Sequence, residues 1–139
     1  MSGFVLDASV ALRWFLDHPV PVYANRVKQV LLKGVRAVVP ALWHLEMSNG
    51  LVVAERRSIL TSADVDQAMV DIEQLVVQAV DTDSIAVSAR QSLATARAFQ
   101  LSAYDAVYLD LARRNRLPLA TLDDRLRSAG AQVGVELLR

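Results

Sequence analysis

Short runs of apolar residues alternate with amphipathic stretches along the whole chain, and this alternation constrains the fold more than any other feature. Short apolar runs bounded by turn residues are typical of buried strands, whereas the longer stretches have the 3.6-residue period of helices. We expect strands over residues 3–6, 36–39, 76–80, 117–120 and 135–138. We expect helices over residues 8–16, 22–33, 42–56, 61–75, 84–99, 102–114 and 123–129. This order predicts an α/β domain of three layers, with a central parallel sheet of about five strands flanked by helices.

The composition excludes several classes of protein. With 53% hydrophobic residues the chain is too apolar for a disordered segment, and its 139 residues suit a single domain spanning positions 1–139. Its apolar runs are far shorter than the roughly 18 residues of a membrane span, and the N-terminus lacks the features of a signal peptide. We therefore expect a cytoplasmic protein without membrane contact. The absence of cysteine excludes disulfides, thiolate metal sites and cysteine nucleophiles.

Acidic residues follow two of the predicted strands. Asp7 comes directly after the first strand, and Asp123 follows the strand over residues 117–120 after two intervening residues. Because parallel sheets bind ligands beyond the carboxyl ends of their strands, both acids should face the same site. A simpler interpretation is that each acid stands where a helix begins, and either caps that helix or interacts with its dipole.

Two further acids lie in predicted helices among apolar neighbours. Glu46 is flanked by Leu45 and Met47, and Asp105 lies in the segment SAYDAVY. A buried carboxylate is costly unless a cation or a set of donors compensates it, and no basic residue directly neighbours either acid. A capping box with Ser102 is a simpler explanation for Asp105, whereas capping does not explain an acid in the middle of a helix.

A group of carboxylates without paired bases is typical of a site for Mg²⁺ or Mn²⁺. These ions prefer oxygen ligands and retain several waters. They activate water and stabilise the charge that develops in phosphoryl transfer. From the residues alone, the alternative that each acid caps a helix or faces solvent stays open.

Four segments that contain these acids resemble, in their order and spacing, segments of the PIN-domain family. Within that family they look like the VapC-type ribonuclease toxins of toxin–antitoxin pairs. The resemblance covers essentially the whole chain. The segments are VLDASVAL (5–12), PALWHLEMSNGL (40–51), LSAYDAVYLDLARR (101–114) and LPLATLDDRL (117–126).

The resemblance implies a PIN-like domain that acts as a metal-dependent endoribonuclease, leaving a 5′-phosphate and a 3′-hydroxyl. The carboxylates that would hold Mg²⁺ or Mn²⁺ are Asp7, Glu46, Asp105 and Asp123. Ser9 and Thr121 would place hydroxyl groups beside the ion. Asn49 lies one helical turn beyond Glu46, so it would orient that carboxylate or contact the scissile phosphate, unless it is an ordinary surface amide.

Asp124 departs from the family pattern, which often has a basic residue at this position. One interpretation is that Asp124 joins the metal shell through a water molecule. The other, which we favour, is that it forms a capping box with Thr121.

The fifteen acidic and fifteen basic residues balance, so net charge alone does not indicate a nucleic-acid partner. From Arg90 onward, however, the chain has eight arginines and only five acids. Arginines that could contact the phosphates of an RNA substrate are Arg90, Arg97, Arg113, Arg114, Arg116, Arg125 and Arg127.

The resemblance also implies protein partners. It implies a cognate VapB-type antitoxin bound in a hydrophobic groove, a homodimer and, in some cases, a larger toxin–antitoxin assembly. Trp14 and Trp43 are candidates for such surfaces, although burial in the core is the interpretation that we favour.

Other functions fit part of the pattern. A receiver-like signalling domain also binds Mg²⁺ at strand ends, but it needs a lysine after the last strands, and no lysine follows Lys33. A phosphatase with an aspartate nucleophile needs a second aspartate at the position of Ser9. A non-catalytic PIN-like binding module has no need of all four acids.

Overall fold

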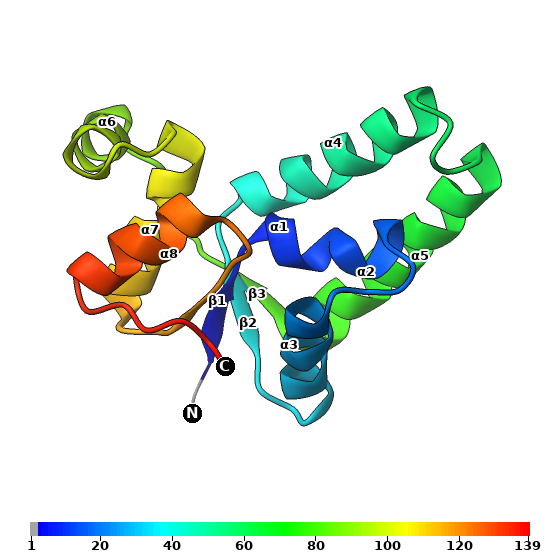
Figure 1. Ribbon diagram of the computed structural model, residues 1–139, viewed down its shortest axis with the longest axis horizontal. Helices are drawn as coiled ribbons and strands as arrows, with labels where there is room; N and C mark the ends of the chain where they lie inside the picture. The colour runs from blue at the N-terminus through cyan, green and yellow to red at the C-terminus, as the bar shows by residue number, and fades with distance from the viewer. Residues whose placement is uncertain (1–2) are drawn as a thin grey trace.

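The computed structural model describes residues 3–139 and contains a four-stranded parallel sheet with helices on both sides (Figure 1). The strands are β1 (Phe4–Leu6), β2 (Ala37–Val39), β3 (Val80–Thr82) and β4 (Leu119–Ala120), and they lie in the order β3-β2-β1-β4. Because every neighbouring pair is parallel, the carboxyl ends of the strands share one edge of the sheet. The predicted α/β class with a central parallel sheet is confirmed.

Helices connect these strands and cover the two faces of the sheet. In Figure 1, α6, α7 and α8 lie on one side of the sheet, and α2, α3 and α5 lie on the other. Helix α4 leads away from the sheet and α5 returns to it, so the two form a projecting arm. The helices are α1 (Ala8–Ala11), α2 (Arg13–Leu16), α3 (Val22–Leu32), α4 (Leu42–Arg56), α5 (Ser62–Ala79), α6 (Ala89–Phe99), α7 (Ala103–Asn115) and α8 (Asp124–Gln132).

The third strand lies further along the chain than the prediction over residues 76–80. Helix α5 continues to Ala79, and β3 begins only at Val80. A short apolar run fits a buried helix as well as a strand, and Leu75 and Val76 pack against the core from the last turns of α5.

The fifth predicted strand, over residues 135–138, is wrong. Within residues 3–139 it is reduced to an isolated parallel bridge between Leu119 and Leu137. Leu119 N–H donates to Glu136 O (2.9 Å), and Leu138 N–H donates to Leu119 O (2.8 Å). Because β4 has only two residues, it offers little edge on which another strand could form.

Several helix ends follow their capping residues rather than the apolar pattern. The helix predicted from residue 84 begins at Ala89, where Ser88 Oγ accepts from Gln91 N–H (3.2 Å). The helix predicted over residues 8–16 is divided at Leu12 into α1 and α2. The capping box of Thr61 and Asp64 at the start of α5 is confirmed.

The core lies on both faces of the central strand. All three residues of β1 are fully buried, as expected for a strand covered on both sides. Trp14 and Trp43 are also buried, so the core interpretation of both residues is confirmed. None of the helices within residues 3–139 is both long and apolar enough to span a membrane.

Candidate active site

Asp7 and Thr121 meet because β1 and β4 pair in parallel, with Leu6 opposite Ala120. Each residue comes directly after the last residue of its strand, at the carboxyl edge of the sheet. Asp7 N–H donates to Ala120 O (3.0 Å), and Thr121 Oγ1 donates to Asp7 Oδ2 (2.7 Å). The sheet register therefore joins two side chains that lie 114 positions apart in the sequence.

The Asp7 carboxylate does not cap the helix that follows it. Asp7 occupies the N-cap position of α1, but its side chain accepts no capping hydrogen bond. Instead, Oδ2 accepts from Ser9 Oγ (2.8 Å) as well as from Thr121. Burial raises the pKa of Asp7, while the hydroxyl donors of Thr121 and Ser9 oppose that rise and the charge of Asp123 adds to it. The capping interpretation therefore does not explain this carboxylate.

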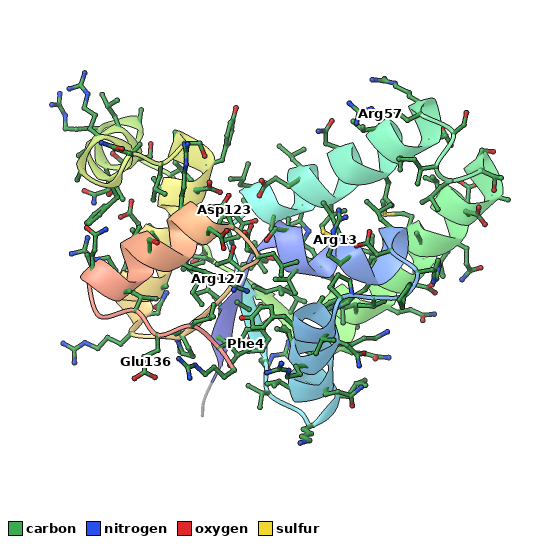
Figure 2. The ribbon with its side chains drawn as sticks, in the orientation of Figure 1. Phe4, Arg13, Arg57, Asp123, Arg127 and Glu136 are labelled. Carbon is green, nitrogen blue, oxygen red and sulfur yellow. The ribbon has the colours of Figure 1, made fainter. Side chains whose placement is uncertain are left out.

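The loop after β4 is held by the same hydroxyl groups. Thr121 Oγ1 accepts from Asp123 N–H (3.0 Å), and Ser9 Oγ accepts from Leu122 N–H (3.1 Å). Asp123 is the N-cap of α8, since its Oδ1 accepts from Leu126 N–H (2.9 Å). Figure 2 shows Asp123 at the beginning of α8, where the N-terminal ends of α1, α4 and α8 converge.

The capping box predicted for Thr121 and Asp124 is wrong. The cap of α8 is Asp123, and the Thr121 hydroxyl is hydrogen-bonded to Asp7 and to the backbone of Asp123. Asp124 is exposed in the first turn of α8, where its charge interacts favourably with the helix dipole.

Glu46 reaches the site from α4 and is held by a residue that the sequence reasoning missed. The half-buried Glu46 carboxylate accepts, through Oε1, a 2.6 Å hydrogen bond from the hydroxyl of Tyr108 on α7. Burial raises the pKa of Glu46, the Tyr108 hydrogen bond opposes this, and the charges of Asp7 and Asp105 raise it further. The available signal was the spacing, because Tyr108 follows Asp105 by three residues on one helix face.

A close contact between helices brings Glu46 to the edge of the sheet. Gly50 lies one turn beyond Glu46 on α4, and a Cβ atom added to it would stand 2.5 Å from Leu12 Cδ2. Helix α4 therefore packs against the end of α1 at a distance that a larger residue would prevent without a shift of Leu12.

Asp105 is the acid that is most strongly affected by its neighbours. Ser102 Oγ accepts from Asp105 N–H (3.0 Å) at the start of α7, so the predicted N-terminal cap is present. Burial, together with the charges of Asp7 and Asp123, raises the pKa of the half-buried Asp105 carboxyl to about 6. The cap accounts for the backbone N–H of Asp105, and the hydrogen bond with Ser102 opposes the rise in pKa only in part.

The structure thus brings the four predicted acids into one electrostatic cluster: Asp7, Glu46, Asp105 and Asp123. Within residues 3–139, the ion pairs join other residues and leave this cluster without a basic partner. Uncompensated carboxylate oxygens are the donors that Mg²⁺ and Mn²⁺ prefer.

The arrangement does not form a closed metal cage. No group of three or more His, Cys, Asp or Glu side chains in the described chain is placed to hold an ion together. Mg²⁺ commonly binds through one or two carboxylates, several waters and substrate phosphates. The donor set therefore fits a largely hydrated ion that is held by only some of the acids at once.

The remaining predicted site residues differ in whether their side chains are free to contact a ligand. Asn49 is exposed on α4, and its side chain makes no hydrogen bond to another described residue. The side chain of Arg127 has a structural role, because its Nε donates to Thr121 O (2.8 Å) and its guanidinium lies 4.7 Å from the centre of the Tyr23 ring. Arg114 pairs with Asp83. The predicted arginines that are exposed and form no ion pair within the described residues are Arg90, Arg97, Arg113, Arg116 and Arg125.

Comparison with known proteins adds two findings. A family model described as "PIN domain" matches residues 4–132 of the chain. The crystal structure of PAE2754 from Pyrobaculum aerophilum is similar, with a TM-score of 0.68 and 18% identity, and the match covers 91% of this chain and 84% of that chain. At this identity the likeness shows the fold alone. A search of curated proteins found no significant match.

Proposed function

Because the chain belongs to the PIN-domain family, whose members are generally nucleases, we propose that it is an endoribonuclease that depends on Mg²⁺ or Mn²⁺. The observation that carries this proposal is the group of four carboxylates. They come from four separate segments of the chain and lie at one edge of the sheet without a basic partner, and the pKa values of Asp7, Glu46 and Asp105 are raised in part by charges of the group.

The residues that would hold the ion are Asp7, Glu46, Asp105 and Asp123. When bound, the ion supplies an activated water and charge stabilisation for hydrolysis of the phosphodiester bond. Ser9 and Thr121 keep the Asp7 carboxylate in one orientation through the hydrogen bonds to Oδ2. The hydroxyl of Thr121 also fixes the loop that carries Asp123.

Exposed arginines of α6, α7 and α8 would contact the phosphates of the RNA. This role falls to residues whose guanidinium groups are not committed elsewhere, namely Arg90, Arg97, Arg113, Arg116 and Arg125. We no longer expect it of Arg127, whose guanidinium supports the Thr121 backbone.

The finer proposal is that the protein is a cytoplasmic VapC-type toxin, neutralised by a VapB-type antitoxin, that forms a homodimer and larger toxin–antitoxin assemblies. Exposed apolar side chains on α3, α4 and α5 would form part of the surface that such a partner covers. These side chains are Val22, Leu32, Leu45, Val52, Val70 and Val77.

The test is cleavage of RNA by the purified protein with Mg²⁺ or Mn²⁺, with and without EDTA. We expect EDTA to abolish cleavage and Asp7→Asn to reduce it by at least about 100-fold, since even residues that only support metal ligands contribute about 10–100-fold. Asp17→Asn is the matched control, because Asp17 is paired with Arg13 by an i,i+4 ion pair away from the cluster. Cleavage that persists in EDTA, or full activity of Asp7→Asn, would contradict the proposal.

A further inference from the structure

Tyr108 connects the two helices that carry acids of the cluster. Its side chain is fully buried, and its hydroxyl donates a 2.6 Å hydrogen bond to Glu46 Oε1 across 62 positions of the sequence. The same helix, α7, presents Asp105 one turn earlier. Glu46 lies on α4, so this bond links the position of one acid to the helix that carries another.

The bond occupies only one of the two oxygens of Glu46. Among the described residues no donor takes Oε2, which leaves that oxygen available for another ligand. Hydrogen bonds engage two of the other acids in a similar way, since Asp7 is held through Oδ2 and Asp123 through Oδ1. Groups that hold one oxygen of a carboxylate orient the other toward a metal ion, and such supporting groups strengthen metal binding.

Resting on the proposed function, we propose that Tyr108 is a positioning residue that holds Glu46 through Oε1 and so directs Oε2 toward the divalent cation. Packing alone does not require the hydroxyl, because phenylalanine would fill the same buried space. A buried tyrosine hydroxyl does require a partner, and here the partner is an acid of the cluster rather than a backbone carbonyl.

The first test is Tyr108→Phe, which removes the hydroxyl and keeps the ring. Mn²⁺ binding to the intact protein is measured by calorimetry without RNA. We expect the affinity to fall by about 10–100-fold, as for other residues that support metal ligands. Cleavage by this variant should be lost at low Mn²⁺ and recover at high Mn²⁺, which a purely structural role would not produce.

Tyr23→Phe is the matched control. The Tyr23 hydroxyl makes a bond of similar length, 2.7 Å, but donates it to the backbone oxygen of Leu138. This variant should leave Mn²⁺ affinity unchanged. An equal loss of affinity in both variants would overturn the positioning role, because it would show a general effect of removing a tyrosine hydroxyl.

A double-mutant cycle separates positioning from stability. In a Glu46→Ala background, Tyr108→Phe should have no further effect on Mn²⁺ affinity, and two losses that simply add would overturn the proposal. If Tyr108→Phe does not fold, Glu46→Asp takes its place. It keeps a carboxylate but withdraws it from the hydroxyl, so unchanged Mn²⁺ affinity would overturn the proposal.

Mn²⁺ binding by the wild-type protein separates a failure of the proposed function from a failure of the role of Tyr108. If it binds no Mn²⁺, the proposed function fails and the role of Tyr108 fails with it. If it binds Mn²⁺ and Tyr108→Phe binds equally well, only the role of Tyr108 is overturned.

Discussion

The candidate site has two halves that are built in different ways. In the sheet half, Asp7 and Asp123 follow strands, and the hydroxyls of Ser9 and Thr121 connect them by short hydrogen bonds. In the helix half, the positions of the Glu46 and Asp105 side chains depend on how α4 and α7 pack. Burial and the charges of Asp7 and Asp123 raise the pKa of Asp105 to about 6, and the hydrogen bond with Ser102 opposes this rise only in part. Hydrogen bonds thus hold both acids of the first half, whereas in the second half Tyr108 holds Glu46 and the half-buried Asp105 carboxyl remains largely uncompensated.

The largest effect on stability is expected from breaking the sheet half with Thr121→Val. This change keeps the shape of a fully buried side chain but removes the bonds to Asp7 Oδ2 and from Asp123 N–H. Leaving such groups without a partner costs about 1–3 kcal/mol of unfolding free energy. Urea unfolding measures this cost, and the rise in melting temperature on adding Mn²⁺ should shrink as well.

Thr95→Val provides the matched comparison for that variant. Thr95 is also buried and donates a 2.8 Å hydrogen bond to Asp110, outside the acidic cluster. It should lose a similar amount of stability and keep the full response to Mn²⁺. If Thr95→Val loses the response too, the sheet half has no special relation to the metal.

An intermediate effect is expected from removing the half-buried charge of the helix half with Asp105→Asn. The folded-state pKa of about 6 lies above the usual 3.8, so the folded protein binds this proton more tightly than the unfolded chain does. The unfolding free energy of the metal-free wild type should therefore fall as pH rises between these two values. At neutral pH, without metal, the variant should be more stable by about 1 kcal/mol, allowing for solvent screening of a half-exposed group.

Thermal unfolding in EDTA across this pH range measures the effect. The gain in stability should vanish below pH 3.8, where the wild-type carboxyl is protonated as well. Destabilisation by Asp105→Asn at neutral pH would instead mean that the carboxylate mainly supports the first turn of α7.

The smallest effect is expected from Asp124→Asn, which probes the boundary of the sheet half. Asp124 is exposed and follows the residue that caps α8. The variant loses only the interaction of this charge with the helix dipole, so we expect its unfolding free energy to fall by less than about 1 kcal/mol. Mn²⁺ affinity should not change. A clear loss of affinity, measured by calorimetry, would place Asp124 in the metal shell.

The two halves also differ in how far the sequence predicts them. Asp7 and Asp123 follow from pattern alone, because apolar strands are recognisable and the carboxyl ends of parallel strands share one edge. The hydrogen bond between Glu46 and Tyr108 could not be predicted from the sequence. The two residues lie 62 positions apart and meet only through the packing of their helices. The residues alone made Glu46 a candidate, because capping does not explain an acid in the middle of a helix, and the resemblance to a family then assigned it to the site.

The boundaries of elements show a similar limit. The apolar run over residues 76–80 has no feature that separates the end of a helix from a strand, and the structure places most of it in α5. To predict that residues 135–138 form no full strand, one would need to know the length of the neighbouring strand, because β4 is too short to pair with all of this segment.

The register between β1 and β4 has a consequence for the order in which the protein is made. Asp7 leaves the ribosome before the threonine that orients it, which is 114 positions further along the chain. A nascent chain that has not yet reached β4 therefore carries the first acid without its supporting hydroxyl and without Asp123. Nuclease activity of this kind would arise only once the segment around residues 119–123 has docked beside β1.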